Sequence, residues 1–205
     1  FNITKDVRRK SLDELKDILK SKIDNMEQTL DAIDDFYLNQ FTARYMLHII
    51  SRMTYYLESN SGINSSFNNY VNRSQKNSYD IEHIWSNNYN QGNHQNEFKT
   101  EEEFKHFRNR FGGLLILPKD KNRSLKDMKY EEKVKKYDSE NLLARTLNPN
   151  CYKNNPLFLR FINEKNFKFK YYDEFNKKEF LERNNLYKDL CKEIWSIERL
   201  DEICR

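Results

Sequence analysis

Two short segments with a strand pattern stand in a chain whose other ordered segments have the spacing of helices. Leu114 to Leu117 is a run of apolar residues closed by Pro118, which has the length of a buried strand. Residues 79–85 alternate well enough for a second strand, with Ile81 on one side and Glu82 on the other. We therefore predict an α+β fold that is mostly helical, in which a strand, loop, strand, helix unit is embedded in a helical domain.

Amphipathic helices are predicted on both sides of this unit. Ser11 and Glu14 have the spacing of a capping box, and apolar residues then recur every three or four positions over 12–33. A second apolar stripe covers 41–57, and we expect these two helices to pack antiparallel. A third stripe covers 180–203. The outer segments are thus interpreted as helical scaffolding.

The segments between these stripes are shorter. Residues 59–78 are rich in Asn and Ser and predict an exposed loop, whereas a capping box at 100–103 predicts a helix that Gly112 and Gly113 stop. Residues 119–137 are predicted to be mostly helical, and 167–171 alternate like a brief strand. We divide the chain into a helical scaffold over 1–60, a core over 61–147 and a second helical scaffold over 148–205, expected to form one compact unit.

Composition limits the function only weakly. Lys plus Arg number 36 against 32 Asp plus Glu, a net charge of +4 that tolerates nucleic acid without demanding it. The three cysteines are far apart and form no CxxC pair, so neither a disulfide framework nor a structural zinc site is indicated. Neither a membrane-spanning run nor a signal peptide is seen, and we expect a cytoplasmic protein without a membrane partner. Because the chain begins with Phe1, we expect a fragment of a longer protein.

The segments around the two strands carry residues suited to phosphodiester hydrolysis. This reaction needs a base to deprotonate water and a divalent cation to neutralise charge. His83 suits the base, because imidazole is mostly neutral at cellular pH. Glu82 or Asp80, together with Asn122, supplies hard oxygen ligands of the kind Mg²⁺ or Mn²⁺ accepts.

Cations next to Asn122 could hold phosphate oxygens and steady the developing negative charge. The candidates for DNA contact are Lys119, Lys121, Arg123 and Lys126. For Lys126 and the other lysines as far as Lys136, a solvated helix face is the alternative interpretation, because glutamates interrupt the run.

The order of these motifs resembles an HNH nuclease. The resemblance rests on Glu82-His83-Ile84, the Gly-x-Leu-x-x-Leu pattern of 112–117, and Asn122. The chain is more closely similar to the nuclease half of GmrSD-type modification-dependent restriction proteins, whose Lys-rich helix ending in Tyr is matched through Lys133 and Tyr137. This resemblance covers roughly residues 40 to 200.

The resemblance implies a ββα-metal finger among helices, with His83 as the base and Glu82 and Asn122 as metal ligands. Asp80 is a reserve ligand, and Arg123 joins His83 and Asn122 in the catalytic set. It also implies an NTP-hydrolysing sensor domain or subunit, N-terminal to the nuclease half, of which this chain shows no phosphate-binding sequence.

Two residues depart from the family pattern. Ser86 stands where the family has Pro, and Gly113 stands where it usually has the Asn that braces the loop carrying the histidine. Asn109 or Asn87 could replace that Asn. Since His83 and Glu82 point to opposite sides of an ideal strand, their sharing one ion predicts a bend in the strand at this point.

We therefore expect a metal-dependent DNA endonuclease that acts on foreign or modified phage DNA, with a homodimer as a candidate assembly. Two alternatives stay open. The first is a nucleic-acid-binding module that has lost catalysis, suggested by Gly113 and Ser86. The second is a helical scaffold for a partner subunit, which the stripes at 12–33 and 180–203 allow.

Overall fold

The computed structural model describes residues 2–24, 33 and 36–203. Helices make up most of the described chain, and the described strands form one antiparallel pair. The longer helices are α2 (Leu12–Asp24), α3 (Ala43–Asn60), α6 (Glu101–Arg108), α7 (Lys119–Leu125), α8 (Tyr130–Tyr137), α10 (Pro156–Glu164) and α11 (Lys177–Ile194). Shorter helices are α1 (Asn2–Val7), α4 (Phe67–Val71), α5 (His94–Glu97), α9 (Leu142–Arg145) and α12 (Glu198–Ile203), with 3-10 turns η2 (Phe111–Gly113) and η3 (Pro149–Tyr152). The predicted mostly helical α+β fold is confirmed.

The two strands are β1 (Tyr79–His83) and β2 (Leu114–Pro118), and they pair antiparallel from Tyr79 opposite Pro118 to His83 opposite Leu114. Residues 114–117 are fully buried, as an uninterrupted apolar run predicts. Pro118 has no N–H to extend the ladder and ends the strand, and α7 begins at the next residue. The strand, strand, helix order expected from the sequence is therefore present.

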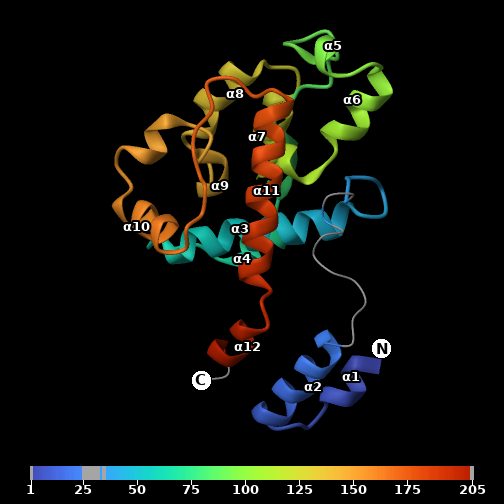
Figure 1. Cartoon of the computed structure of the whole chain (residues 1–205), viewed down its shortest axis with the longest axis vertical. Helices are drawn as coiled ribbons and strands as arrows, with labels where there is room; N and C mark the ends of the chain where they lie inside the picture. The colour runs from blue at the N-terminus through green and yellow to red at the C-terminus, as the bar shows by residue number, and fades with distance from the viewer. Residues whose placement is uncertain (1, 25–32, 34–35, 204–205) are drawn as a thin grey trace.

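Helix α3 forms the base on which this unit rests. Its buried face carries Met46, Ile50, Met53 and Leu57, at the spacing of one side of a helix. Helix α3 contacts α4, α9, α10, α11 and both strands. Figure 1 shows α11 crossing α3, and α11 also packs on η2, which leads directly into β2. Elements distant in sequence thus hold β1 and β2 in place.

A cluster of aromatic rings fills the space between the loop after β1, α6 and the start of α11. At its centre lies Trp85, which is 3% exposed and donates its indole N–H to the carbonyl of Phe175. Ring centroids within about 6 Å of the indole belong to His94, Phe98, Phe104, Phe107, Phe175 and Phe180. The many aromatic residues of the sequence therefore build a core beside β1.

The N-terminal helices α1 and α2 lie at one end of the molecule, next to α12 (Figure 1). The capping box of α2 is formed, because Glu14 accepts from the Ser11 backbone N–H and Ser11 Oγ accepts from the Glu14 N–H. Lys20 binds Asp201 of α12 at 2.9 Å. The expected antiparallel packing of α2 on α3 is wrong, because no side chain of α2 is buried and α2 meets α12 instead. The expected continuation of this helix over 25–32 lies outside the described residues.

The charged segment after Pro118 is mostly helical, as expected, and divides into α7 and α8. Two further local expectations need correction. Residues 59–78 contain the short helix α4. Residues 167–171 form no strand, because their backbone meets no partner strand in the described chain.

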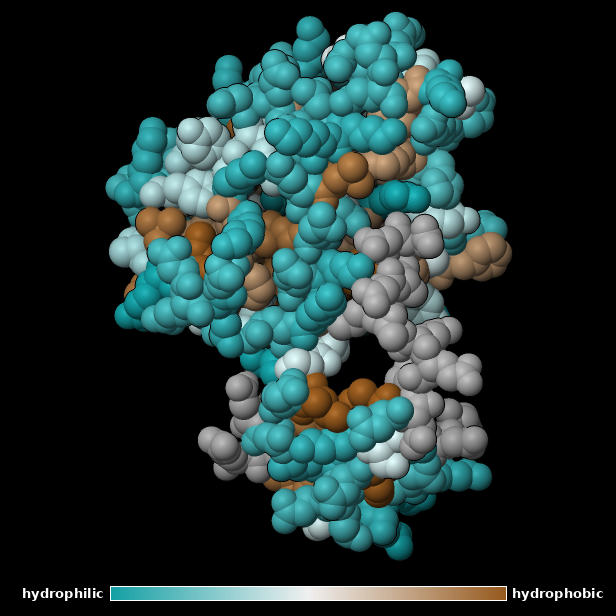
Figure 2. Space-filling view, viewed as in Figure 1, coloured by the Kyte–Doolittle hydropathy of each residue, from teal (hydrophilic) through white to brown (hydrophobic). Residues whose placement is uncertain are grey.

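Among the helices that the structure describes, none is long and apolar enough to cross a membrane. The face shown in Figure 2 is mostly hydrophilic, as the mean hydropathy of -1.02 leads one to expect.

Candidate active site

The ββα unit brings Asn122 next to the strand that carries His83. The first turn of α7 is tied to β1, because Lys119 N–H donates to the carbonyl of Ser78 at 3.0 Å. One turn further, Asn122 Nδ2 donates to the carbonyl of Ile81 at 2.9 Å. With its NH₂ group held by β1, the amide oxygen Oδ1 is the part of Asn122 left to bind a ligand.

His83 is half-buried at the end of β1, and its ring is held by Asn109. Nε2 of His83 lies 2.8 Å from Oδ1 of Asn109. Because an amide oxygen only accepts, Nε2 carries the proton in this contact and Nδ1 keeps its lone pair. The geometry therefore presents Nδ1 as the basic atom of the imidazole.

The surroundings of His83 keep the ring unprotonated. Burial, followed by the positive charge of Arg108, lowers the pKa of His83 to about 3. Arg108 is itself fixed, since its Nε donates to the carbonyls of Trp85 and Ser86 at 3.0 Å each. The imidazole is consequently neutral at cellular pH, as a general base must be before it acts.

Asn109 takes the place of the Asn that the family pattern leads one to expect at position 113. A Cβ at Gly113 would lie 2.3 Å from Cε2 of the buried Phe180, so no larger side chain fits there. Asn109 lies at the C-terminal end of α6, and its backbone carbonyl also accepts from Leu38 N–H at 2.8 Å. Of the two replacements considered, Asn109 and Asn87, the structure brings Asn109 to the histidine.

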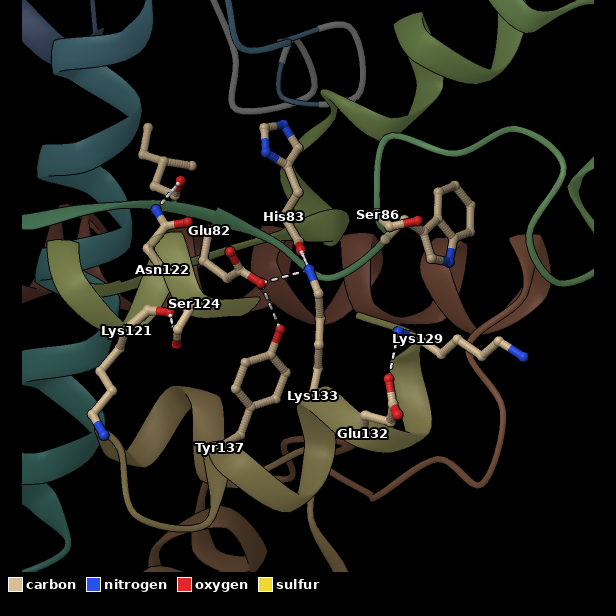
Figure 3. A network of polar contacts seen from close by, with 12 residues as sticks. Glu82, His83, Ser86, Lys121, Asn122, Ser124, Lys129, Glu132, Lys133 and Tyr137 are labelled. Atoms are coloured by element: carbon tan, nitrogen blue, oxygen red, sulfur yellow. Dashed lines mark hydrogen bonds and ion pairs between the residues drawn. The ribbon is translucent and has the colours of Figure 1, made fainter. Parts of the chain in front are cut away.

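Glu82 points away from His83 into the protein, toward α8 (Figure 3). Its Oε1 accepts from Lys133 Nζ at 2.7 Å and from Tyr137 Oη at 3.0 Å, and all three side chains are almost fully buried. Lys133 Nζ also donates to the carbonyl of His83 at 2.6 Å. Burial raises the pKa of Glu82 and lowers that of Lys133. The ion pair thus ties α8 to the end of β1.

The bend expected at the loop entry is present at Ile84 and Trp85, but it comes after His83 and does not bring Glu82 and His83 to one side. The ladder stays in register to His83 opposite Leu114, and Ile84 N–H continues it by donating to the carbonyl of Gly113 at 2.8 Å. Successive side chains of an unbent strand point to opposite faces. Glu82 and His83 therefore belong to different sides of β1.

The remaining candidates lie around Asn122. Asp80 forms an ion pair with Arg73 at 2.8 Å, which occupies one carboxylate oxygen of this reserve ligand. The predicted DNA-contacting cations are all on or next to α7: Lys121, Arg123 and Lys126 are exposed and Lys119 is half-buried. The family resemblance pointed to Lys133 and Tyr137 as a matching pattern, but their contact with Glu82, which lies 51 positions before Lys133, could not be predicted from spacing alone.

The donor set suits an ion held by few protein ligands. Among the described residues, no group of three or more His, Cys, Asp or Glu side chains is placed to hold a metal. Asn122 Oδ1 and the second oxygen of Glu82 are hard donors, and Mg²⁺ is commonly bound through one or two protein oxygens with water and substrate phosphate completing its shell. Asn122 Oδ1 therefore fits such an ion, whereas Glu82 fits it through the one carboxylate oxygen that Lys133 and Tyr137 do not bind.

The fold thus encloses a small ββα unit, with His83 on its first strand and Asn122 on its helix, among helices. Comparison with known proteins identifies the family. Residues 3–190 match the family described as GmrSD restriction endonucleases, C-terminal domain. The chain therefore belongs to this family, as the order of its motifs predicted. No curated protein and no solved structure matches the chain.

Proposed function

We propose that this chain is a metal-dependent DNA endonuclease in which His83 is the general base. The observation that carries the proposal is the imidazole itself, which is half-buried, neutral and bound through Nε2 to Asn109 at 2.8 Å. Asn122 lies on the helix directly after β2, in the same ββα unit. Membership of a restriction endonuclease family supports DNA as the substrate on which this proposed base acts.

In the proposed reaction His83 Nδ1 takes a proton from a water molecule as the water oxygen attacks phosphorus. The bond from phosphorus to the opposite ester oxygen then breaks, and the leaving oxygen is protonated from solvent. Asn122 Oδ1 and Glu82 are the residues that would hold Mg²⁺ or Mn²⁺, which would neutralise charge on the phosphate and on the leaving oxygen. Arg123 and the lysines of α7 supply positive charge beside this position.

Further parts of the proposal concern the biological setting. Foreign or modified phage DNA as the target, a cytoplasmic location, an N-terminal NTP-hydrolysing sensor and a homodimer are predictions that follow from the family resemblance. The alternative of a binding module without catalysis loses one of its two reasons, because Asn109 binds the histidine that Gly113 cannot reach.

The test is plasmid nicking. Purified protein incubated with supercoiled plasmid should produce nicked circles with Mg²⁺ or Mn²⁺ and none with EDTA, and His83→Ala should lose at least about 100-fold of the rate. The matched control is His106→Ala, which removes an exposed imidazole of α6. His83→Ala protein that nicks as fast as the parent would refute the assignment of the base. Parent protein that binds DNA but does not nick it with either metal would support the binding module instead.

A further inference from the structure

The exposed face of α3 carries aromatic and cationic side chains at helical spacing. Phe41 precedes the helix and is 76% exposed, and Tyr45 is 50% exposed. Arg44 and His48 are also exposed, and positions 41, 44 or 45, and 48 fall on one side of a helix. Exposed aromatic faces beside cations are typical of surfaces that bind nucleic acid, because bases stack on rings and phosphates bind cations.

A groove of about 540 Å³ leads from this face to Asn122. Its walls come from α3, from the segment after α4, from β1 and from α7. The polar residues that line it are Arg44, His48, Arg73, Asp80 and Asn122. None of the cations first considered for DNA contact, which belong to α7, lines this groove.

The groove runs along β1 next to His83. Asp80 and Ile81 both line it, and Ile81, two positions before His83 on the strand, has its side chain on the face that carries His83. Leu38 lines it too, and its N–H donates to the carbonyl of Asn109, the residue that binds His83. A strand of DNA in the groove would therefore have the proposed base and the proposed metal ligand Asn122 along its path.

The two arginines of the groove differ in how they are held. Within the described part of the chain, Arg44 forms no ion pair with a carboxylate, and its guanidinium lies 4.5 Å from the ring centroid of Tyr45. Arg73 is 55% exposed, is bound to the carbonyl of Tyr79 and pairs with Asp80 at 2.8 Å. Among the residues that the structure describes, Arg44 thus has no carboxylate partner, and Arg73 is fixed at the edge of the same groove.

We propose that this groove binds the sugar-phosphate backbone of one DNA strand next to the phosphate that is cut. Arg44 and Arg73 each contact one phosphate, and Phe41 and Tyr45 supply aromatic faces where the strand leaves the groove. This inference rests on the proposed function and adds to it the path of the substrate. It makes α3, rather than α7 alone, part of the DNA-binding surface.

The experiment measures binding of a fluorescein-labelled duplex by anisotropy, in the His83→Ala background so that the DNA stays intact. Arg44→Ala combined with Arg73→Ala should weaken binding at least about 10-fold at about 100 mM salt. The slope of log Kobs against log salt concentration should become shallower by about 0.9 for each lost phosphate contact, or about 1.8 for both. Arg44→Ala alone should give half of that slope change.

The matched control is Arg160→Ala, which removes an exposed arginine of α10 outside the groove. It should leave both affinity and slope unchanged, and circular dichroism verifies that all variants are folded. A double variant that binds with the parental affinity and slope overturns the groove proposal, as does absence of binding by the His83→Ala protein itself. Plasmid nicking by the parent protein is measured separately. If the parent nicks DNA but the double variant binds DNA with parental affinity and slope, only the groove proposal is refuted. If the protein binds DNA but the parent shows no metal-dependent nicking, only the proposed catalysis is refuted.

Discussion

Lys133 is a buried cation in a helix whose other lysines face solvent. Its side chain is 1% exposed and joins the carboxylate of Glu82 to the carbonyl of His83. Taking both charges out of water is costly, and the pair is stable only while both partners are present. Lys133 therefore acts on the site through β1, as a positioning residue.

Removing one member of this pair should destabilise the protein strongly. Lys133→Met leaves Glu82 buried without its counter-charge and should lower the free energy of unfolding by about 3 to 5 kcal/mol. Adding Glu82→Gln removes the stranded charge and should recover much of that loss. Urea denaturation of the parent, Lys133→Met, Glu82→Gln and the double variant completes this double-mutant cycle and gives the coupling energy of the pair.

The double variant also separates the two roles of Glu82. If Glu82 is a metal ligand, as proposed, the folded double variant should not nick plasmid with Mg²⁺. Nicking at the parental rate by this variant would show that Glu82 is only the partner of Lys133, and would leave Asn122 as the protein ligand.

Asn109 should affect the rate of the reaction more than substrate binding. Asn109→Ala frees the His83 ring and its tautomer, so we expect kcat to fall about 10- to 100-fold while KM stays within about twofold. Asn109→Gln should restore part of kcat, because it keeps the accepting oxygen. Asn87→Ala is the matched control, since Asn87 is exposed and should leave both constants unchanged. A loss confined to KM would contradict the orienting role.

At the scale of elements, η2 packs closely against α11. This contact limits the size of the side chains that fit at positions 112 and 113. A Cβ at Gly112 would lie 2.6 Å from the backbone oxygen of Phe180, whereas a Cβ at Gly113 would meet the ring of Phe180 at 2.3 Å. One obstacle is main chain and the other is a side chain. The two glycines are therefore required for different reasons.

This difference predicts a specific rescue. Gly112→Ala and Gly113→Ala should each destabilise the protein by about 1 to 3 kcal/mol through overpacking. Phe180→Leu should relieve the cost of Gly113→Ala but leave the cost of Gly112→Ala unchanged, when each is compared with Phe180→Leu alone. Thermal denaturation of the parent, the three single variants and the two double variants that contain Phe180→Leu gives the coupling energy of Phe180 with each glycine position. Equal rescue at both positions would contradict the proposed packing.

The elements that the sequence predicts correctly are those whose signal is local. The run 114–117 ends at a proline, and Thr100 Oγ1 caps α6 by accepting from Glu103 N–H at 3.1 Å, as its spacing indicates. Residues 167–171 have a strand's alternation, but a strand also needs a neighbour, and alternation contains no information about one. The site follows the same rule: His83 and Asn122 could be found from motif order, whereas the pairing of Glu82 with Lys133 depends on contacts across 51 positions.

At the scale of the whole molecule, stability should depend on pH through a second buried histidine. His94 is 6% exposed, and its ring packs at a tilt against Trp85 and Phe104, at 4.7 and 4.6 Å between ring centroids. Burial, and then the charge of Arg108, lowers the pKa of His94 to about 4. In the unfolded chain the value is about 6.5.

Between these two values the unfolded chain binds more protons than the folded protein, so stability increases with pH. The contribution of a neutral His94 is present above about pH 6.5 and is lost as the pH falls toward about 4. His94→Phe keeps the ring packing and should reduce the slope of unfolding free energy in this window by up to about 1.4 kcal/mol per pH unit. Urea titrations at pH 7, 6 and 5 measure the slope, with exposed His106→Phe as the control. An unchanged slope for His94→Phe would contradict the burial of a neutral ring.

The aromatic cluster around Trp85 gives the domain an intrinsic optical reporter. The chain has two tryptophans; Trp85 is enclosed by rings two residues after His83, and Trp195 is 44% exposed at the end of α11. In a Trp195→Phe protein, emission would come from Trp85 alone and would be shifted to short wavelength. Opening of the core beside β1 could then be followed in real time, in the presence of DNA and without an attached dye.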